Sequence, residues 1–323
     1  MRIGLQLGPE RGRYPEKVAK LLEGARRAEE LGYHSVWVPQ LPDDFDAMTA
    51  IALMGQVTER VELGTAVMPI QSRHPVAMAQ QALSTQAACS GRFVPGLGPS
   101  HHWIVSDMLG LPYEKPAGHV RAYVEVLRTA FAGPGPVDVE NDWYTVHNPL
   151  DVTDLPTPIL VAALGPTMLR TAGELADGTI LWMADEKAIA EHIVPRITEA
   201  ATGAGRPAPR VVAGVPVTLC SPGEEDEVRA WTNRALAHAE YSPNYQTLLE
   251  RGDASDVGDM AAVGDEAAIA ARLASYRDAG ATDIAVRVVP WASPATSASP
   301  AATAPSPSSP PSPDPFWRQK TSL

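Results

Sequence analysis

The sequence predicts an α/β protein that folds as a (β/α)8 barrel. Short apolar runs alternate along the chain with longer stretches whose apolar residues recur at helical spacing, which is the pattern of βαβ units in a parallel sheet. Eight strand-and-helix candidates can be counted, the number found in a (β/α)8 barrel. A doubly wound sheet is the alternative, but it should carry a phosphate-binding glycine loop after its first strand. The segment Gly8–Gly12 lacks that pattern.

The strands are marked by β-branched and apolar residues that lie between turn signals. They are predicted at Arg2–Leu7, Ser35–Val38, Val61–Val67, Arg92–Leu97, Ile159–Ala163, Thr179–Met183, Val211–Leu219 and Asp283–Val289. A further short strand, Trp143–Val146, is expected among Pro- and Gly-rich connections between the fourth and fifth of these strands.

The helices follow from apolar faces and from end signals. Helical spacing begins at Val18 and stops before Gly32, a suitable C′ residue. Asp46 can cap a second helix that runs through Val57, and Pro75 suits position N1 of a third. The remaining helices are predicted near residues 120–131, 167–176, 186–202, 224–250 and 265–279.

The chain changes character near its C-terminus. Pro290–Pro315 holds nine of the 31 prolines, interleaved with Ser, Ala and Thr, and shows no apolar periodicity. Such composition is typical of disorder. We therefore predict a barrel over residues 1–290 and a disordered tail over residues 291–323.

Composition and charge limit the classes of partner. The chain has 26 Lys and Arg against 38 Asp and Glu, and its net charge of −12 disfavours nucleic acid and anionic membrane surfaces. Cys89 and Cys220 lack the spacing of a metal or redox motif, and the apolar residues before Pro9 are too few for a signal peptide. We expect a cytoplasmic protein with a small-molecule substrate, and a homodimer remains open.

Functional residues of a barrel lie where its strands end. The segment Gly96–Trp103 combines two glycines with polar and aromatic groups, so its backbone can approach a flat ligand closely. Adjacent histidines rarely converge on one metal ion, so exposed loop histidines are the alternative to a ligand contact, and we expect no metal. Ala162–Met168 passes from a strand directly into a helix, which makes either an anion site or a simple βα turn.

Two charged loops have plainer interpretations. Arg73 precedes a helix and is either a cation for an anionic ligand or a solvated charge. Asp43, Asp44 and Asp46 indicate a solvated loop with a helix cap rather than a catalytic pair.

Several motifs occur together in one order. They are Leu63-Gly64-Thr65-Ala66-Val67, the run from Arg73 to Ala82, Ser90-Gly91-Arg92-Phe93 leading to Gly96-Leu97-Gly98, Ala163-Leu164-Gly165-Pro166, and Ala176-Asp177-Gly178. With these motifs the chain resembles the luciferase-like monooxygenase superfamily over roughly residues 1–290, and within it the oxidoreductases that use the 5-deazaflavin coenzyme F-420.

The resemblance implies a luciferase-like (β/α)8 barrel with the coenzyme ring across the strand ends. The ring would lie near a bulge at Thr65, Ala66 and Val67, with a cis peptide at Ala66–Val67, and the next loop would meet it through Gly98, Ser100 and His101. The coenzyme phosphate would be received by Ala163, Leu164, Gly165, Thr167 and Met168.

The chain also departs from the sugar-phosphate dehydrogenases of this superfamily. At the positions of their Asp-His pair this chain has Gln40 and Leu41, and at the position of their Glu it has His101. Their Thr and Lys that bind the substrate phosphate are replaced by Trp182 and Asp185. A sugar phosphate is therefore not expected. Apolar residues at the strand ends (Leu41, Trp103, Trp182 and Met183) favour a weakly polar substrate, or else they pack the barrel rim.

The activity implied by the resemblance is hydride transfer between F-420 and a small organic substrate. The coenzyme carries out the redox step at a carbon of its ring. The protein orients the substrate and supplies a proton. His101 is the candidate proton donor, because an imidazole exchanges a proton near neutral pH. The alternatives are an FMN-dependent monooxygenase of the same superfamily and a non-catalytic flavin- or deazaflavin-binding protein.

Deletion of the tail should leave the barrel stable. The tail has no apolar periodicity that could offset an ordering cost of about 1–2 kcal/mol per residue. Thermal denaturation of the truncated and full chains should give the same melting temperature. A large drop after truncation would show that the tail packs against the barrel.

Overall fold

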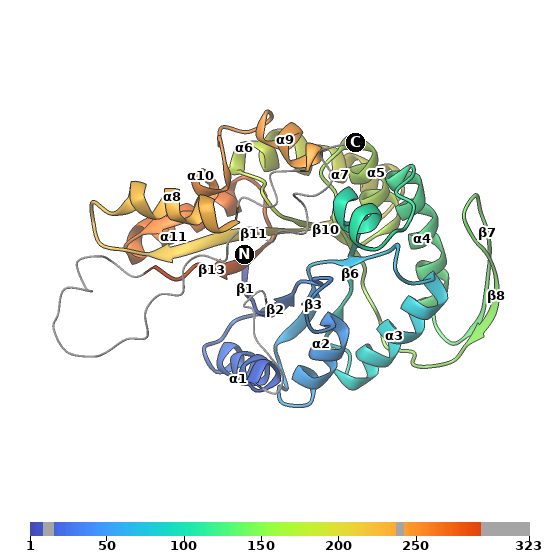
Figure 1. The fold of residues 1–323 in the computed structure, drawn as a ribbon. Coiled ribbons are helices and arrows are strands. Elements are labelled where there is room, and N and C mark those ends of the chain that lie inside the picture. Colours follow the sequence, from blue (N-terminus) through green and yellow to red (C-terminus); the bar gives the residue numbers. More distant parts are fainter. Residues whose placement is uncertain (9–15, 237–241, 292–323) are drawn as a thin grey trace, which may run out of the picture. The chain divides into compact units, whose positions relative to one another are not determined.

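The computed structural model describes residues 1–8, 16–236 and 242–291, and it contains a ring of parallel strands. The strands of the ring are β1 (Arg2–Gln6), β2 (Ser35–Val38), β3 (Glu62–Thr65) with β4 (Met68–Pro69), β5 (Phe93–Val94) with β6 (Gly96–Gly98), β9 (Leu160–Val161), β10 (Gly178–Leu181), β11 (Arg210–Leu219) and β13 (Asp283–Val288). Figure 1 shows their arrangement.

The pairing of these strands closes the barrel. β1 pairs in parallel with both β2 and β13, and the ladder continues from β2 to β3 and from β13 through β11 and β10 to β9. β9 pairs with β6, while β3 pairs with β5 and β4 with β6. Because β3 and β4 are parts of one interrupted strand, as are β5 and β6, the ring returns to its start. The predicted (β/α)8 barrel is confirmed.

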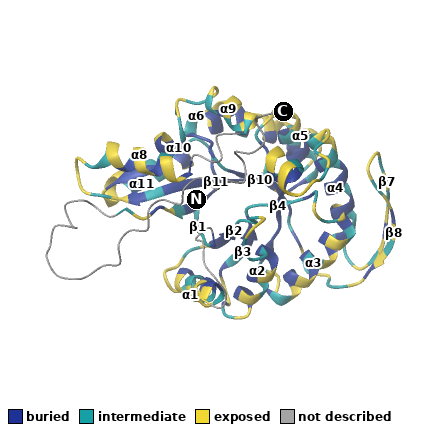
Figure 2. Ribbon diagram, viewed as in Figure 1, coloured by how far each residue is buried: buried dark blue, intermediate teal, exposed yellow. Residues whose placement is uncertain are grey.

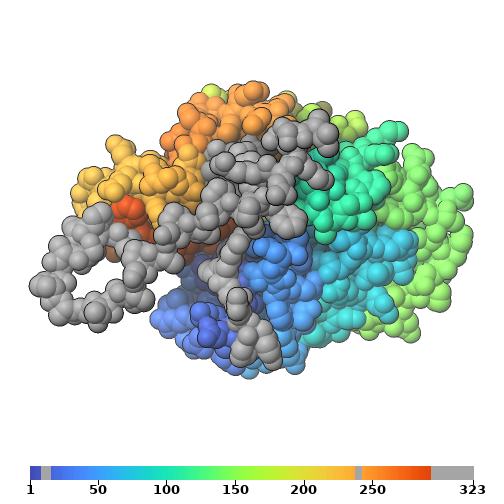
Figure 3. Space-filling model, in the orientation of Figure 1, coloured from blue at the N-terminus to red at the C-terminus, as the bar shows by residue number. Residues whose placement is uncertain are grey.

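Helices cover the outside of this ring (Figure 1), and Figure 3 shows the molecule in the same orientation as a space-filling model. The longer helices are α1 (Glu16–Glu30), α2 (Ala47–Gly55), α3 (Pro75–Ala88), α4 (Pro116–Ala130), α5 (Pro166–Leu175), α7 (Val194–Gly203), α8 (Glu225–Leu236) and α11 (Glu266–Asp278). The shorter segments are α6 (Glu186–Ala188), α9 (Pro243–Leu249), α10 (Val257–Met260) and two π-helical turns, η1 (Trp103–Met108) and η2 (Ile189–Ile193). In the described part of the chain, no helix is long and apolar enough to cross a lipid bilayer.

The structure corrects several predicted elements. The short strand expected at Trp143–Val146 begins instead at Thr145: β8 (Thr145–Leu150) forms a hairpin with β7 (Gly135–Glu140). The helix predicted over 186–202 is interrupted by η2, and α8 and α9 are separate helices within the stretch predicted as 224–250. A short strand, β12 (Ala262–Gly264), pairs with β11 and was not predicted.

The inside of the barrel is filled in layers. At the end where the strands begin, Arg210 lies 2.7 Å from Asp283 and 2.9 Å from Glu62, and Arg2 lies 3.2 Å from Glu62. Above these ion pairs lies a buried apolar cluster of Trp37, Val94, Leu160, Ile180, Val212 and Ala285. The layers make the barrel a packed core and not a pore, which leaves the opposite end for a ligand.

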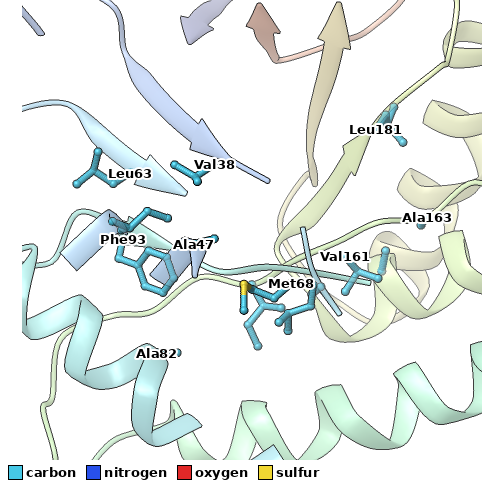
Figure 4. Close-up of a cluster of buried hydrophobic side chains, with 14 of the residues drawn as sticks. Val38, Ala47, Leu63, Met68, Ala82, Phe93, Val161, Ala163 and Leu181 are labelled. Atoms are coloured by element: carbon cyan, nitrogen blue, oxygen red, sulfur yellow. The ribbon is translucent and has the colours of Figure 1, made fainter. Parts of the chain in front are cut away.

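The larger core lies between the outer face of the barrel and the helices (Figures 2 and 4). It joins strand residues such as Leu63 and Val161 to helix residues such as Ala47 and Ala82, all of them fully buried. Parallel strands buried on both faces have near-continuous apolar sequences, which is why their positions could be predicted from sequence.

A side chain joins the two interrupted strands. The Thr65 hydroxyl donates to the Gly96 carbonyl and accepts from the Gly96 N–H, both at 2.8 Å, and Thr65 is fully buried. A Cβ on Gly96 would lie 2.1 Å from the Thr65 carbonyl oxygen, so only glycine fits this approach. The next peptide, Ala66–Val67, is cis, as the resemblance implied.

The tail predicted over residues 291–323 lies outside the described residues except for Trp291. The Trp291 ring lies 6.1 Å from that of Trp231, whose Nε1–H donates to the Pro290 carbonyl at 3.1 Å. A truncation that tests the tail should therefore begin at Ala292.

Substitution of Thr65 by Val should destabilise the barrel. Val keeps the shape but loses the hydroxyl, so two buried backbone groups of Gly96 lose their partner, at about 1–3 kcal/mol for each group. Urea denaturation should show a clearly lower free energy of unfolding than for Thr65→Ser, which keeps the hydroxyl. Equal stabilities of the two variants would contradict this role for the hydroxyl.

Candidate functional site

A cavity of about 280 Å³ opens where strands β2, β4 and β6 end. Its lining comes from the end of β4 and from the loops that follow the three strands: Gln40, Pro42, Pro69, Ser72, Arg73, Ser100, Ile104 and Leu109. Two of the loops are held together, because Gln71 Nε2 donates to the Pro99 carbonyl at 2.7 Å. Ser100 is thus the predicted site residue that lines this cavity.

The bulge after β3 lies between the barrel interior and this mouth. Ala66 and Val67 are half-buried and pack against the interior apolar cluster, and the Ala66 N–H donates to the Val38 carbonyl at 2.9 Å. A Cβ on Gly98 would lie 3.0 Å from both Val67 Cγ2 and Ala162 Cβ. The structure therefore brings Ala66, Val67 and Gly98 together. The Thr65 side chain instead forms its hydrogen bonds with Gly96.

The loop after β6 turns sharply at Ser100. This residue has a φ of 58°, in the left-handed region that is uncommon for a serine, and its carbonyl accepts from the Tyr113 hydroxyl at 3.1 Å. Backbone conformations of this kind cluster at functional sites. The turn directs the chain into His101 and then into η1.

His101 packs among aromatic rings at the mouth. Its ring centroid lies 5.7 Å from Trp103 in a stacked arrangement and 5.8 Å from Tyr245 of α9, a helix that follows β11. Burial lowers the pKa of His101 below its usual 6.5, so the ring is neutral at pH 7. A neutral imidazole still has one N–H to donate and one nitrogen to accept.

The two adjacent histidines do not converge. His102 contacts Tyr113 edge-to-face at 5.5 Å, away from the rings that surround His101. Across the described ranges, no group of three or more His, Cys, Asp or Glu side chains is placed to hold a metal ion.

Charged groups beside the cavity are paired. Arg73 forms an ion pair with Asp46 at 2.5 Å, and Asp46 also caps α2 by accepting from the Thr49 N–H at 2.9 Å, as predicted. Asp43 is exposed, as predicted for this loop, but Asp44 is mostly shielded from solvent because it forms an ion pair with the buried Lys17 at 2.5 Å. Arg73 therefore reaches the cavity with much of its charge already neutralised.

The segment after β9 forms the expected helix start. Gly165 is the N-cap of α5 and has no side chain to cap it, and Pro166 is the first helical residue. The N–H groups of Thr167 and Met168 lie in the first turn, where no intrahelical acceptor exists. Ala163 is fully buried, whereas Gly165 and Thr167 are exposed, and Leu164 is half-buried. This end of α5 suits an anion.

The apolar floor predicted for the substrate is not continuous. Met183 is 2% exposed and packs with Leu236, Val257 and Met260, so it belongs to the rim packing. Trp182 is half-buried, and the Arg287 guanidinium lies 5.7 Å from its ring centroid. Side chains alternate between the two faces of a strand, and Ala285 of β13 points into the barrel. The sequence could therefore have predicted that Arg287, two residues later, lies at the inner side of the mouth.

Comparison with known proteins assigns the family. The family model of luciferase-like monooxygenases matches residues 1–283. The chain belongs to this family. Two curated proteins are similar to this chain in sequence. One is a Mycobacterium tuberculosis protein named as a coenzyme F-420-dependent oxidoreductase, and the other is the 5,10-methylenetetrahydromethanopterin reductase of Methanopyrus kandleri. The first is 30% identical over 55% of this chain and 54% of its own length, and the second 28% identical over 71% and 68%.

Solved structures show the same fold. The coenzyme F-420-dependent tetrahydromethanopterin reductase of Methanopyrus kandleri superposes with a TM-score of 0.71 at 23% identity, over 90% of this chain and 93% of that chain. The oxygenating constituent of 3,6-diketocamphane monooxygenase from Pseudomonas putida, in complex with FMN, gives a TM-score of 0.68 at 16% identity, over 88% and 91%.

Proposed function

We propose that this luciferase-like protein is an oxidoreductase that transfers a hydride between coenzyme F-420 and a small, weakly polar organic substrate. The observation that carries the proposal is the conjunction, at one end of the barrel, of the bulge at Ala66–Val67 with the uncapped start of α5. The names of the Mycobacterium tuberculosis relative and of the solved Methanopyrus kandleri reductase support F-420 as the coenzyme.

The residues at the mouth fit a flat ring that carries a phosphate. Gly98 has no side chain where it approaches Val67, so this wall of the site is backbone and small groups. The N–H groups of Gly165, Thr167 and Met168 would hold the phosphate, with Ala163 and Leu164 setting the turn. Ala66, Val67, Ser100 and His101 would line the ring, and Thr65 would fix the bulge through Gly96.

The bound deazaflavin would supply the hydride chemistry, and the chain would orient the substrate beside it. The neutral His101 can donate its N–H to a substrate carbonyl or imine, which would favour reduction by withdrawing electron density. The aromatic rings of Trp103 and Tyr245 hold this imidazole in place. Substrate would enter through the cavity beside Ser100.

An FMN-dependent monooxygenase is the second candidate. The similarity of fold to a monooxygenase in complex with FMN favours it, because the same barrel accommodates a true flavin in that protein. Both coenzymes carry a phosphate, so the start of α5 does not discriminate between them.

Titration of the purified protein with F-420 and with FMN, side by side, tests which of the two coenzymes the protein uses. We expect F-420 to bind at least tenfold more tightly, a difference of about 1.4 kcal/mol. Coenzyme fluorescence measures both affinities. Preferential binding of FMN, with flavin that reacts with oxygen after reduction, would instead identify a monooxygenase.

Substitution of Gly165 by Val should weaken coenzyme binding without unfolding the chain. Gly165 has φ −85° and ψ 159°, which a β-branched residue adopts readily, and a Cβ there meets open space. The added methyl groups would block the anion from the N–H groups of α5. We expect at least a tenfold loss of F-420 affinity, about 1.4 kcal/mol, at an unchanged melting temperature. Wild-type affinity in Gly165→Val would mean that the phosphate is held elsewhere.

A further inference from the structure

His192 connects the loop before α5 to a guanidinium from a distant part of the chain. It lies in η2 and is 4% exposed. Its Nε2 is 2.7 Å from the Leu164 carbonyl oxygen, and its Nδ1 is 2.8 Å from an Nη of Arg251, which follows α9. Leu164 and Arg251 therefore lie at opposite edges of one buried imidazole.

The two contacts fix the state of this ring. A guanidinium can only donate and a carbonyl can only accept, so Nδ1 carries no proton and Nε2 carries one. His192 is thus a neutral imidazole. Its pKa is lowered first by burial and then by the charges of Arg251 and Arg196, although the bond to Leu164 opposes this shift.

The backbone beside Arg251 is held by a buried carboxylate. Asp185 is 5% exposed and accepts from the N–H groups of Asp253 at 2.6 Å and Ala254 at 2.9 Å. A Cβ on Gly252 would lie 2.3 Å from Asp185 Oδ2, so the chain passes close to this carboxylate. Asp185 also caps α6 through the Ala188 N–H at 2.8 Å. The loops after β9, β10 and β11 are thereby joined.

Arg251 differs from Arg73 in having no carboxylate partner within the described residues. In the described part of the chain its guanidinium contacts the neutral His192 and forms no ion pair with a carboxylate. The neighbouring acid, Asp253, is paired with Lys187 at 2.7 Å. Arg73, by contrast, is neutralised by Asp46.

We propose that Arg251 is the cation that binds the coenzyme phosphate beside the start of α5, and that His192 is the positioning residue that holds Arg251 there. This inference rests on the proposed function, because the proposed function places a phosphate at α5. It holds for F-420 and FMN alike, since each carries a phosphate.

The test uses the full-length protein and two ligands, F-420 and its deazaflavin fragment that lacks the phosphate and all that follows it. Arg251→Ala should weaken F-420 binding about tenfold at low ionic strength and less at high salt, because an exposed charge is screened. Binding of the phosphate-free fragment should stay at the wild-type value. Arg234→Ala on α8 removes the same charge from an exposed position and should leave both affinities unchanged.

His192 is tested by a rescue. His192→Ala should weaken F-420 binding by a factor similar to that of Arg251→Ala, and the double variant should lose little more, because the two residues act together. His192→Gln offers an amide donor for Leu164 and a carbonyl acceptor for Arg251, so it should recover most of the affinity. Melting temperatures of all variants identify any general loss of structure.

The outcomes separate the two proposals. If the wild type binds F-420 but Arg251→Ala binds it equally tightly, the inference is overturned and the proposed function stands. Equal weakening of F-420 and of the phosphate-free fragment would overturn it too, because Arg251 would then support the fold and not the phosphate. A wild-type protein that binds neither F-420 nor FMN overturns the proposed function and the inference with it.

Discussion

The pairing of Thr65 with Gly96 holds the barrel closed where its ladder is interrupted. Below this point Leu63 pairs with Phe93, and above it Met68 pairs with Leu97. Between them the backbone makes the bulge, and the Thr65 hydroxyl supplies both hydrogen bonds to Gly96. A side chain thus replaces a ladder contact, which lets the bulge face the mouth while no buried polar group of Gly96 is left unpaired.

The bulge divides the barrel mouth into two parts with different chemistry. The loops after β2, β4 and β6 enclose the cavity and are joined by Gln71 and by the pairing of Arg73 with Asp46. The loops after β9, β10 and β11 are joined by His192 and Asp185, and they include the uncapped start of α5. A substrate suits the first part, and an anionic group suits the second.

Much of the fold could be predicted because its strands are buried on both faces, and such strands have distinctive apolar runs. The hairpin at 135–150 was missed, since Pro136 and Pro149 read as connections although they face each other across the hairpin. The cis peptide came from family resemblance, because no property of Ala66 or Val67 signals it. His192 and Arg251 could not be found at all: they are 59 residues apart, and their contact depends on how three loops meet.

A net charge of −12 makes the location of a few cations important for any anionic ligand. Most arginines near the barrel ends are matched with carboxylates, as Arg210 is with Asp283 and Glu62, and such pairs contribute little net field. Backbone N–H groups at a helix start attract an anion without any formal charge. A guanidinium fixed by a neutral histidine adds a full charge at short range, whereas a carboxylate partner would have cancelled it. The neutrality of His192 is therefore what would allow Arg251 to act on a ligand in an otherwise acidic protein.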